Sequence, residues 1–259
     1  MKRKSLLVLL LLAGCRPAVS SASVSSLAVL PAGCQTPGTV QFLSLEQGGG
    51  IPYEYGLYLP PCYDETGGAY PLVYLVPGRT SRPQTWLAPS AAEIADDLIL
   101  TGELPPFIMV ATENTDSDMF AQAIISQLIP YIESHYPVSA ERRHHAVAGG
   151  SLGGIAAYRI GFSLPDHFAS VGMFGSGAIS GEETRIRAWI QAMTPRDRPR
   201  VFLNTGFADP LMLERARAML TLLDEGGIAH THIFTDGDHS YAYWLTNFPA
   251  YLHWAALDW

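Results

Sequence analysis

The sequence predicts an α/β fold in which an antiparallel β-hairpin leads into a mostly parallel, doubly wound sheet. Three observations support this prediction. Apolar, strand-like runs alternate with helical patterns along the chain. A Gly-rich connection joins the first two of these runs. A chain of 259 residues with 48% hydrophobic residues can also bury one large core. The sequence contains no internal repeat and no boundary to a second folded domain.

Residues 1–15, "MKRKSLLVLLLLAGC", have the pattern of an export signal. Lys2, Arg3 and Lys4 precede a short apolar run, which is shorter than the roughly 20 residues needed to span a bilayer. The run ends in Leu-Ala-Gly-Cys, which resembles the lipobox of bacterial lipoproteins. We therefore expect Cys15 to carry a lipid and to anchor an exported chain to the cell membrane, on its extracytoplasmic side. An ordinary cleaved secretory signal is the alternative.

Residues 16–35 are rich in Ser and Ala and are expected to form a flexible tether, with residues 36–259 forming the catalytic domain. Removal of the signal takes away three positive charges, so the net charge changes from −8 to −11, and no lysine is left. Nucleic acid is therefore an improbable partner, because no basic stripe exists to meet phosphates. The absence of lysine also excludes Ser-Lys and Schiff-base chemistry and leaves histidine as the base for a serine nucleophile.

Two further cysteines flank the predicted hairpin. Strand-like runs at Thr39–Leu45 and Tyr55–Leu59 are joined by "EQGGGIP", and Cys34 and Cys62 lie almost symmetrically about that turn. An exported chain permits oxidation, so we expect a disulfide between them, with two unpaired core thiols as the alternative. The sequence has no C-x-x-C and no Cys/His cluster with zinc spacing, so no metal site is predicted.

The remaining elements alternate along the chain. The expected strands after the hairpin are Pro71–Val76, Pro106–Ala111, His145–Ala148, Ala169–Phe174, Val201–Asn204 and His230–Phe234. The expected helices span residues 89–102, 118–136, 152–163, 182–193, 211–226 and 240–254.

A serine lies between the third of these later strands and the helix that follows it. Residues 149–153 read Gly-Gly-Ser-Leu-Gly, which matches the G-x-S-x-G nucleophile elbow. The short pattern alone has little weight, but the strand before it and the small residues of the helix after it supply the context that the motif requires. Ser151 is therefore the candidate nucleophile.

The base is sought among the histidines that follow Ser151, because the order Ser, acid, His is expected on this fold. His239 lies in a loop just past the last strand, at the edge of the sheet where such folds place their sites. His167 follows the elbow too soon, and His253 lies late in the last helix. His230 and His232 alternate on a strand and lack a third metal ligand at a set spacing. His239 is the preferred base.

The acid is sought in the loop after the strand that ends near residue 204. Asp209 in that loop could bind Nδ1–H of His239 and fix its tautomer. Glu214, Asp236 and Asp238 are the competitors, and Asp238 could equally shape the turn beside Gly237. Asp209 is the preferred acid.

Four motifs together resemble the esterase D-like branch of the α/β-hydrolases: "YLPPCYDETGGAYPLVYLVPG", "QLIPYIESHYPVSAERRHHAVAGGSLGG", "LPDHFASVGMFGSG" and "GDHSYAYW". That branch includes feruloyl and acetylxylan esterases, enterochelin-type siderophore esterases, S-formylglutathione hydrolase and mycolyltransferases. The resemblance covers about residues 38–256. It implies a triad of Ser151, Asp209 and His239, an oxyanion hole formed by the backbone N–H groups of Leu152 and Arg79, and no metal or organic cofactor.

The sequence departs from these relatives at two positions. Many relatives have His-Gly where this chain has Pro77-Gly78, which puts the positioning of the oxyanion loop in doubt, although the backbone donors themselves remain. Relatives also often have an acidic residue where Gln127 stands, which affects a helix contact and not the chemistry.

The substrate is read from the surroundings of the expected triad. The interval from Gly175 to Arg200 has room for little more than one helix, so no cap domain and an open cleft are expected. Residues expected near the substrate pocket, which could equally pack within the fold, are Gly78, Trp86, Gly150, Tyr241, Tyr243 and Trp244. The resemblance and the export signal favour an extracytoplasmic ester, such as a feruloyl or acetyl polysaccharide ester or a siderophore ester. An acyltransferase of the mycolyltransferase type and an inactive binding lipoprotein are the alternatives.

Overall fold

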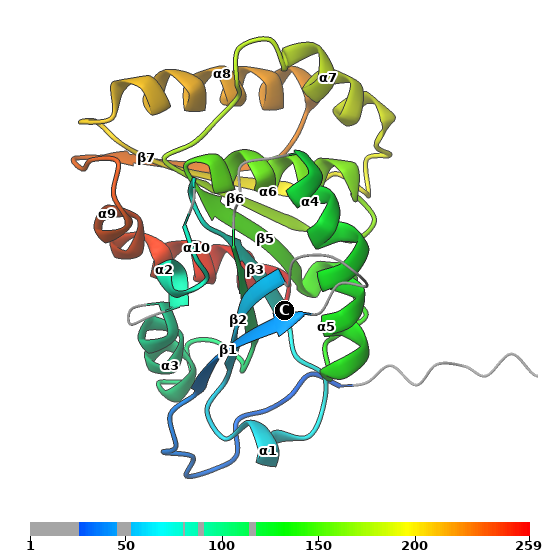
Figure 1. Ribbon diagram of the computed structural model, residues 1–259, viewed down its shortest axis with the longest axis vertical. Helices are drawn as coiled ribbons and strands as arrows, with labels where there is room; N and C mark the ends of the chain where they lie inside the picture. Colours follow the sequence, from blue (N-terminus) through cyan, green and yellow to red (C-terminus); the bar gives the residue numbers. More distant parts are fainter. Residues whose placement is uncertain (1–25, 46–52, 80, 88–90, 114–117) are drawn as a thin grey trace, which may run out of the picture.

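The computed structural model describes residues 26–45, 53–79, 81–87, 91–113 and 118–259. The described residues confirm the α/β fold with an eight-stranded sheet in the order β1-β2-β4-β3-β5-β6-β7-β8 (Figure 1). β1 pairs antiparallel with β2 and β2 pairs antiparallel with β4, whereas all the other pairs are parallel. The strands are β1 (Thr39–Leu45), β2 (Tyr53–Leu59), β3 (Leu72–Val76), β4 (Ile108–Thr112), β5 (His145–Gly150), β6 (Ser170–Phe174), β7 (Arg200–Gly206) and β8 (His230–Thr235).

Helices cover both faces of this sheet (Figure 1). They are α1 (Tyr63–Thr66), α2 (Gln84–Trp86), α3 (Ala92–Leu100), α4 (Asp118–Ala123), α5 (Ile129–His135), α6 (Leu152–Ser163), α7 (Glu183–Ala192), α8 (Pro210–Gly226), α9 (Tyr241–Thr246) and α10 (Phe248–Ala255). The core beneath α5, α6, α7 and α8 is separate from the core beneath α3 and α10.

Strand β3 shows how the sheet divides these two cores. Leu72, Tyr74 and Val76 face the α6 side, whereas Val73 and Leu75 face the α10 side, and all five are fully buried. Side chains alternate between the faces of a strand, so a strand covered on both faces is apolar throughout. This continuous apolar run is the feature from which the sequence predicted a buried parallel strand.

The observed elements follow the predicted ones closely, and every predicted strand forms with its ends within two residues of the expected positions. The helices differ more. The helix expected over residues 118–136 is interrupted by a π-helical stretch (Ile124–Leu128) between α4 and α5. The helix expected over 240–254 is divided at Asn247, because Pro249, in the first turn of α10, cannot donate a backbone hydrogen bond to a preceding turn.

The expected tether differs from the structure at its C-terminal end. Residues 1–25, and Cys15 with them, lie outside the described residues. Ala28 is buried, its N–H donates to the carbonyl of Ala69, and the N–H of Ala69 donates to Ser26. Residues 26–28 therefore pair with the domain at Ala69, so this end of the expected tether is not free. Within the described residues, no helix combines the length and apolar character needed to cross a bilayer.

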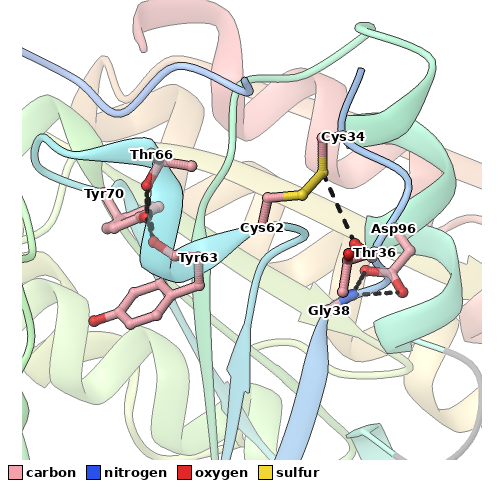
Figure 2. The surroundings of a disulfide bond; sticks show 8 residues. All are labelled: Cys34, Thr36, Gly38, Cys62, Tyr63, Thr66, Tyr70 and Asp96. Atoms are coloured by element: carbon pink, nitrogen blue, oxygen red, sulfur yellow. Dashed lines mark hydrogen bonds between the residues drawn. A yellow bond between two sulfur atoms is a disulfide. The ribbon is translucent and has the colours of Figure 1, made fainter. Parts of the chain in front are cut away.

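A disulfide joins Cys34 and Cys62, as predicted (Figure 2). Cys34 precedes β1 and Cys62 follows β2, so the antiparallel register, with Thr39 opposite Leu59, brings the two residues to the same edge of the sheet. Beside them, the N–H of Gly38 donates to the Asp96 carboxylate of α3 (3.0 and 3.1 Å). This edge is the one at which the parallel strands begin, because β2 is antiparallel to β4.

Candidate active site

Ser151 lies in the sharp turn between β5 and α6. Its backbone has φ 56° and ψ −121°, and it is one of two non-glycine residues with positive φ in the described part of the chain. Its N–H donates to the carbonyl of Phe174 at the end of β6 (2.8 Å), which fixes the turn to the neighbouring strand. A strained non-glycine conformation held in this way is typical of functional turns.

The glycines around Ser151 are required by close backbone approach. A Cβ at Gly153 would lie 2.0 Å from the carbonyl oxygen of Val76, and one at Gly150 would lie 2.4 Å from the ring of Trp244. Neither neighbour can move aside without disturbing the fold, because the Val76 oxygen belongs to the backbone of β3 and the Trp244 ring is buried. The lack of a side chain at Gly153 therefore lets α6 pack against β3, and the lack of one at Gly150 leaves room for the ring of Trp244.

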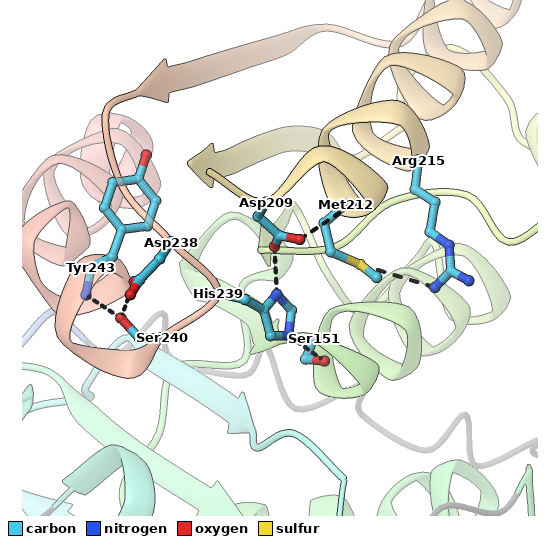
Figure 3. A network of polar contacts seen from close by, with 8 residues as sticks. All are labelled: Ser151, Asp209, Met212, Arg215, Asp238, His239, Ser240 and Tyr243. Carbon is cyan, nitrogen blue, oxygen red and sulfur yellow. Dashed lines mark hydrogen bonds and ion pairs between the residues drawn. The ribbon is translucent and has the colours of Figure 1, made fainter. Parts of the chain in front are cut away.

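His239 connects Ser151 to Asp209 (Figure 3). Nε2 of His239 lies 2.9 Å from Oγ of Ser151, and its Nδ1 lies 2.5 Å from Oδ2 of Asp209. Because a carboxylate can only accept, Nδ1 carries the proton, and in the neutral ring Nε2 presents its lone pair to the serine hydroxyl. The side chain of His239 is 39% exposed and that of Asp209 is 10% exposed. The serine and histidine therefore face solvent, while the carboxylate lies beneath them.

The position of Asp209 follows from the start of α8. It is the N-cap residue, and its Oδ1 accepts from the N–H of Met212 (3.5 Å), which leaves Oδ2 for His239 (Figure 3). Asp238 has a different role, since it accepts from the hydroxyl of Ser240, which caps α9. Asp236 and Glu214 are exposed. Of the carboxylates weighed in the sequence, Asp209 is thus the one that the structure places on His239.

The other candidate histidines lie in other environments. His253 pairs with Glu103 (3.2 Å), and His230 lies 3.7 Å from Asp224. His232 is exposed on β8. His167 contacts His145 and Glu133 at the opposite edge of the sheet from Ser151.

The loop after β3 passes beside the serine. A Cβ at Gly78 would lie 3.6 Å from Cβ of Ser151 and 3.6 Å from the carbonyl oxygen of Gly150. The N–H of Gly78 donates to the hydroxyl of Tyr241 (2.8 Å), and burial raises the pKa of that hydroxyl, so it stays protonated. Tyr241 was expected as a pocket wall, but its bond to Gly78 was not foreseen, because the two residues are 163 positions apart and no local pattern links them.

Trp86 and Trp244, also expected near the pocket, are buried (0% and 2% exposed). The indole of Trp86 donates to the carbonyl of Val76 (3.1 Å), and its ring stacks near that of Trp244, with the ring centroids 6.5 Å apart. The ring of His239 meets Trp244 edge-on at 5.1 Å. The two tryptophans, together with the buried Tyr243, form the floor that supports the site, so for them the packing interpretation holds and the wall interpretation does not.

Between β6 and β7 the chain forms one helix, α7, and no cap domain, as expected. The candidate site therefore has no domain inserted above it at this point.

Comparisons with known proteins give relatives of the chain in sequence and in fold. A protein of Xylanibacter ruminicola named endo-1,4-beta-xylanase/feruloyl esterase is 28% identical over 148 residues, which are 52% of this chain. The match covers 20% of that relative, so the chain spans about a fifth of its length.

Two solved structures share the fold. The feruloyl esterase module from Clostridium thermocellum complexed with sinapinate has a TM-score of 0.73 and 21% identity, with 89% of this chain and 94% of that chain covered. The enterobactin esterase from Shigella flexneri has a TM-score of 0.67 and 17% identity, with 88% and 60% covered.

A family model described as "Putative esterase" matches residues 50–255, which is more than half of the chain. The chain belongs to this esterase family and is a carboxylic ester hydrolase with an α/β-hydrolase fold.

Proposed function

We propose that the chain hydrolyses its ester through Ser151 as nucleophile, His239 as general base and acid, and Asp209 as the group that orients the histidine. One observation carries this proposal: two consecutive hydrogen bonds, of 2.9 Å and 2.5 Å, connect a strained serine to a buried carboxylate through one imidazole. Nucleophile, base and orienting group are thus each in contact with the next, as nucleophilic catalysis requires.

The reaction takes two steps. In the first, Nε2 of His239 accepts the hydroxyl proton as Oγ of Ser151 bonds to the ester carbonyl carbon. The tetrahedral intermediate then collapses, and the bond to the alcohol oxygen breaks as that oxygen takes the proton from His239. In the second step, His239 takes a proton from water, whose oxygen attacks the acyl-enzyme, and the carboxylic acid leaves as Ser151 regains its proton.

The oxyanion hole is proposed from two backbone N–H groups. Leu152 is the first residue of α6, so its N–H has no carbonyl partner within the helix and lies at the positive end of the helix dipole. In the loop beside Ser151, the N–H of Gly78 already donates to Tyr241. The resemblance to the esterase D-like hydrolases implies the N–H of the next residue, Arg79, as the second donor. This role uses the backbone alone and is compatible with Pro77 at the preceding position.

The proposed substrate is an ester with an apolar acyl group. Phe207 and Leu211, on either side of Asp209 in the chain, are 52% and 54% exposed and give the loop beside the triad apolar surface. Such a surface suits an aromatic acyl group, and the relatives named above include feruloyl esterases. A feruloyl ester on a polysaccharide is therefore preferred over a small acetyl ester or a siderophore ester.

The proposed location is extracytoplasmic, with Cys15 as lipid anchor. The sequence of residues 1–15 supports it, and a disulfide in the domain is compatible with export. Cys15→Ala should move the enzyme from the membrane fraction to the soluble fraction with its specific activity unchanged. Protein that stays membrane-bound after this change would exclude the lipid as the anchor.

The central experiment combines Ser151→Ala with a panel of esters. Ser151→Ala should lower kcat/KM by at least about 10⁴-fold while the melting temperature stays near that of the wild type. An aryl phosphonate should label the wild-type chain at Ser151. Activity above a few per cent in the folded variant, or an adduct on another residue, would overturn the assignment.

The panel addresses the substrate separately. Methyl ferulate, p-nitrophenyl acetate and a catecholate siderophore ester are compared by kcat/KM, with and without an added acceptor alcohol. The proposal expects the feruloyl ester to have the highest value and water to be the acceptor. A higher value for the siderophore ester, or transfer to the alcohol in preference to water, would replace the proposed substrate or reaction without affecting the triad.

A further inference from the structure

Three potential metal ligands converge at the edge of the sheet opposite to Ser151. Glu133 comes from α5, His145 is the first residue of β5, and His167 lies in the turn after α6. Nε2 of His167 lies 3.2 Å from Nδ1 of His145 and 3.0 Å from Oε1 of Glu133, and the latter two atoms are 3.8 Å apart. Within the residues that the structure describes, this is the one such group of three or more His, Cys, Asp or Glu side chains.

The buried histidine of this group is held in one tautomer. Nε2 of His145 lies 2.5 Å from the carbonyl oxygen of Ser139, and because a carbonyl can only accept, Nε2 carries the proton. Nδ1 therefore presents a lone pair to Glu133 and His167. A histidine whose second nitrogen is anchored to a backbone carbonyl is the usual arrangement for a metal ligand.

The spacing of the three ligand atoms fits a small divalent cation. The circle through atoms separated by 3.2, 3.0 and 3.8 Å has a radius of about 2 Å, so one ion can reach all three at the Zn–N and Zn–O distances of about 2.0–2.2 Å. The two imidazole planes are inclined by 67° in a T-shaped arrangement, so the rings are not stacked. Two imidazoles and a carboxylate are ligands that Zn²⁺ accepts. We propose that Glu133, His145 and His167 form a binding site for a divalent transition-metal ion of the Zn²⁺ class.

A fourth ligand position is available in the adjoining cavity. This cavity of about 220 Å³ is lined by the three residues together with Asp166 and Arg142, among others. The guanidinium of Arg142 donates to the carbonyl oxygens of Pro165 (2.6 Å) and Asp197 (2.8 Å), so its hydrogen bonds are directed at backbone. Water, or the Asp166 carboxylate on the cavity wall, can complete a four-coordinate site.

In the metal-free chain, a proton takes the place that the cation would occupy. Nε2–H of His167 faces two acceptors, the Glu133 carboxylate and Nδ1 of His145, and holds them together. A divalent ion replaces that proton and makes three bonds in place of one shared hydrogen bond. These three bonds link α5, β5 and the turn after α6. Ser151 lies six positions after His145, about 20 Å along an extended strand, so the ion stabilises the fold and does not take part in the ester chemistry.

The experiment uses the chain without a histidine tag. It is dialysed against EDTA and titrated with ZnCl₂ at pH 7.5, with binding followed by calorimetry and thermal unfolding. Glu133→Gln and His167→Gln remove one ligand each from positions less buried than His145. The double variant His230→Gln/His232→Gln removes a histidine pair outside the cluster and is the matched control. A chain labelled at Ser151 by the phosphonate excludes Zn²⁺ binding at His239.

The proposal expects one Zn²⁺ per chain. At a free concentration 100 times the Kd, the ion should raise the melting temperature by about 5–10 °C in the wild-type, control and phosphonate-labelled chains. Both ligand variants should lose this increase and keep their esterase activity. The proposal is overturned if the wild type binds no stoichiometric Zn²⁺, or if Glu133→Gln and His167→Gln bind it as tightly as the wild type does.

If the variants fold poorly, a measurement on the wild type alone tests whether these three residues bind the ion. X-ray absorption of the Zn²⁺-loaded chain should show two imidazole nitrogens with oxygen ligands at about 2.0–2.1 Å. A spectrum with fewer than two imidazoles would reject the site.

Discussion

The two ends of strand β5 carry different kinds of polar site. At its carboxyl end, Ser151 and His239 face solvent, and Asp209 is held by the first turn of a helix. At its amino end, His145 is 4% exposed and is fixed by a backbone carbonyl. The carboxyl end of a parallel sheet is where loops and helix N-termini meet, so it supplies backbone N–H groups and open space. At the amino end, by contrast, the histidine is buried and its orientation is fixed by a hydrogen bond. This difference suits the first site to chemistry and the second to holding an ion.

The largest effect that separates the two ends should come from Asp209→Asn. The asparagine can still cap α8, so stability should change little, but its amide can donate to Nδ1 and favour the wrong tautomer of His239. We expect kcat to fall by about 10³- to 10⁴-fold in ester-hydrolysis assays, with Zn²⁺-dependent stabilisation unchanged.

Two other carboxylates control for charge near the site. Asp238→Asn and Glu214→Gln should change kcat less than about threefold, because Asp238 bonds Ser240 and Glu214 is exposed on α8. If Glu214→Gln were the crippling change, the orienting role would pass to Glu214.

A smaller effect is expected from Tyr241→Phe. The change removes the acceptor that holds the N–H of Gly78 and so loosens the loop beside Ser151. Because an oxyanion hole acts in the transition state, kcat should fall about tenfold while KM changes little.

Tyr243→Phe is the matched control for this change. Its hydroxyl bonds Asn204 (3.2 Å) and Thr235 (2.9 Å) beneath the site, so its loss should lower the melting temperature and leave kcat near that of the wild type. A Tyr241→Phe enzyme whose kcat matches that of Tyr243→Phe would show that the loop position does not depend on this bond.

The two ends also differ in how far the sequence could predict them. Ser151 could be placed because an elbow is a local pattern, and His239 and Asp209 because loops after neighbouring parallel strands meet at one edge. The contact of His145 with His167 depends on a tight turn after α6 across 22 residues, and no motif has that spacing. The burial of Trp86 likewise follows from packing against Trp244 and Phe248, which comes from the far end of the chain.

Removal of the disulfide should change stability at the edge where the parallel strands begin and leave the edge where they end, with Ser151, unchanged. The two cysteines are 28 positions apart, so the double variant Cys34→Ser/Cys62→Ser should lose about 3.5 kcal/mol of stability on the chain-entropy model. The melting temperature should fall by roughly 7–14 °C, with kcat unchanged. A fall in kcat as large as that of Tyr241→Phe would show that loss of the disulfide disturbs the site around Ser151 at the opposite edge of the sheet.

The smallest predicted effect concerns acid stability away from both ends of β5. Burial raises the pKa of the Glu182 carboxyl, but hydrogen bonds from Arg159 (2.5 Å) and from the Tyr158 hydroxyl outweigh it and hold the pKa below its usual value. A carboxyl whose pKa is lower in the folded chain adds stability above the unfolded pKa of about 4.5, and this contribution is lost as the pH falls through the folded pKa. Glu182→Gln should therefore lower the free energy of unfolding by about 1–2 kcal/mol at pH 7 and flatten its decline below about pH 4.5.

The matched control for Glu182 is Glu225, which pairs with Arg187 (2.9 Å) while both side chains are nearly half exposed. Glu225→Gln should cost much less stability than Glu182→Gln does, because solvent screens an exposed pair. Urea unfolding of both variants from pH 3 to pH 8 measures the difference. Two outcomes would contradict this prediction: an equal loss of unfolding free energy in both variants at pH 7, or the same decline of that free energy with falling pH in Glu182→Gln and the wild type. Either would mean that the ion pair between α6 and the start of α7 adds no pH-dependent stability. The acid sensitivity of the fold would then have to come from other groups, with the buried His145 at the amino end of β5 the first to be tested.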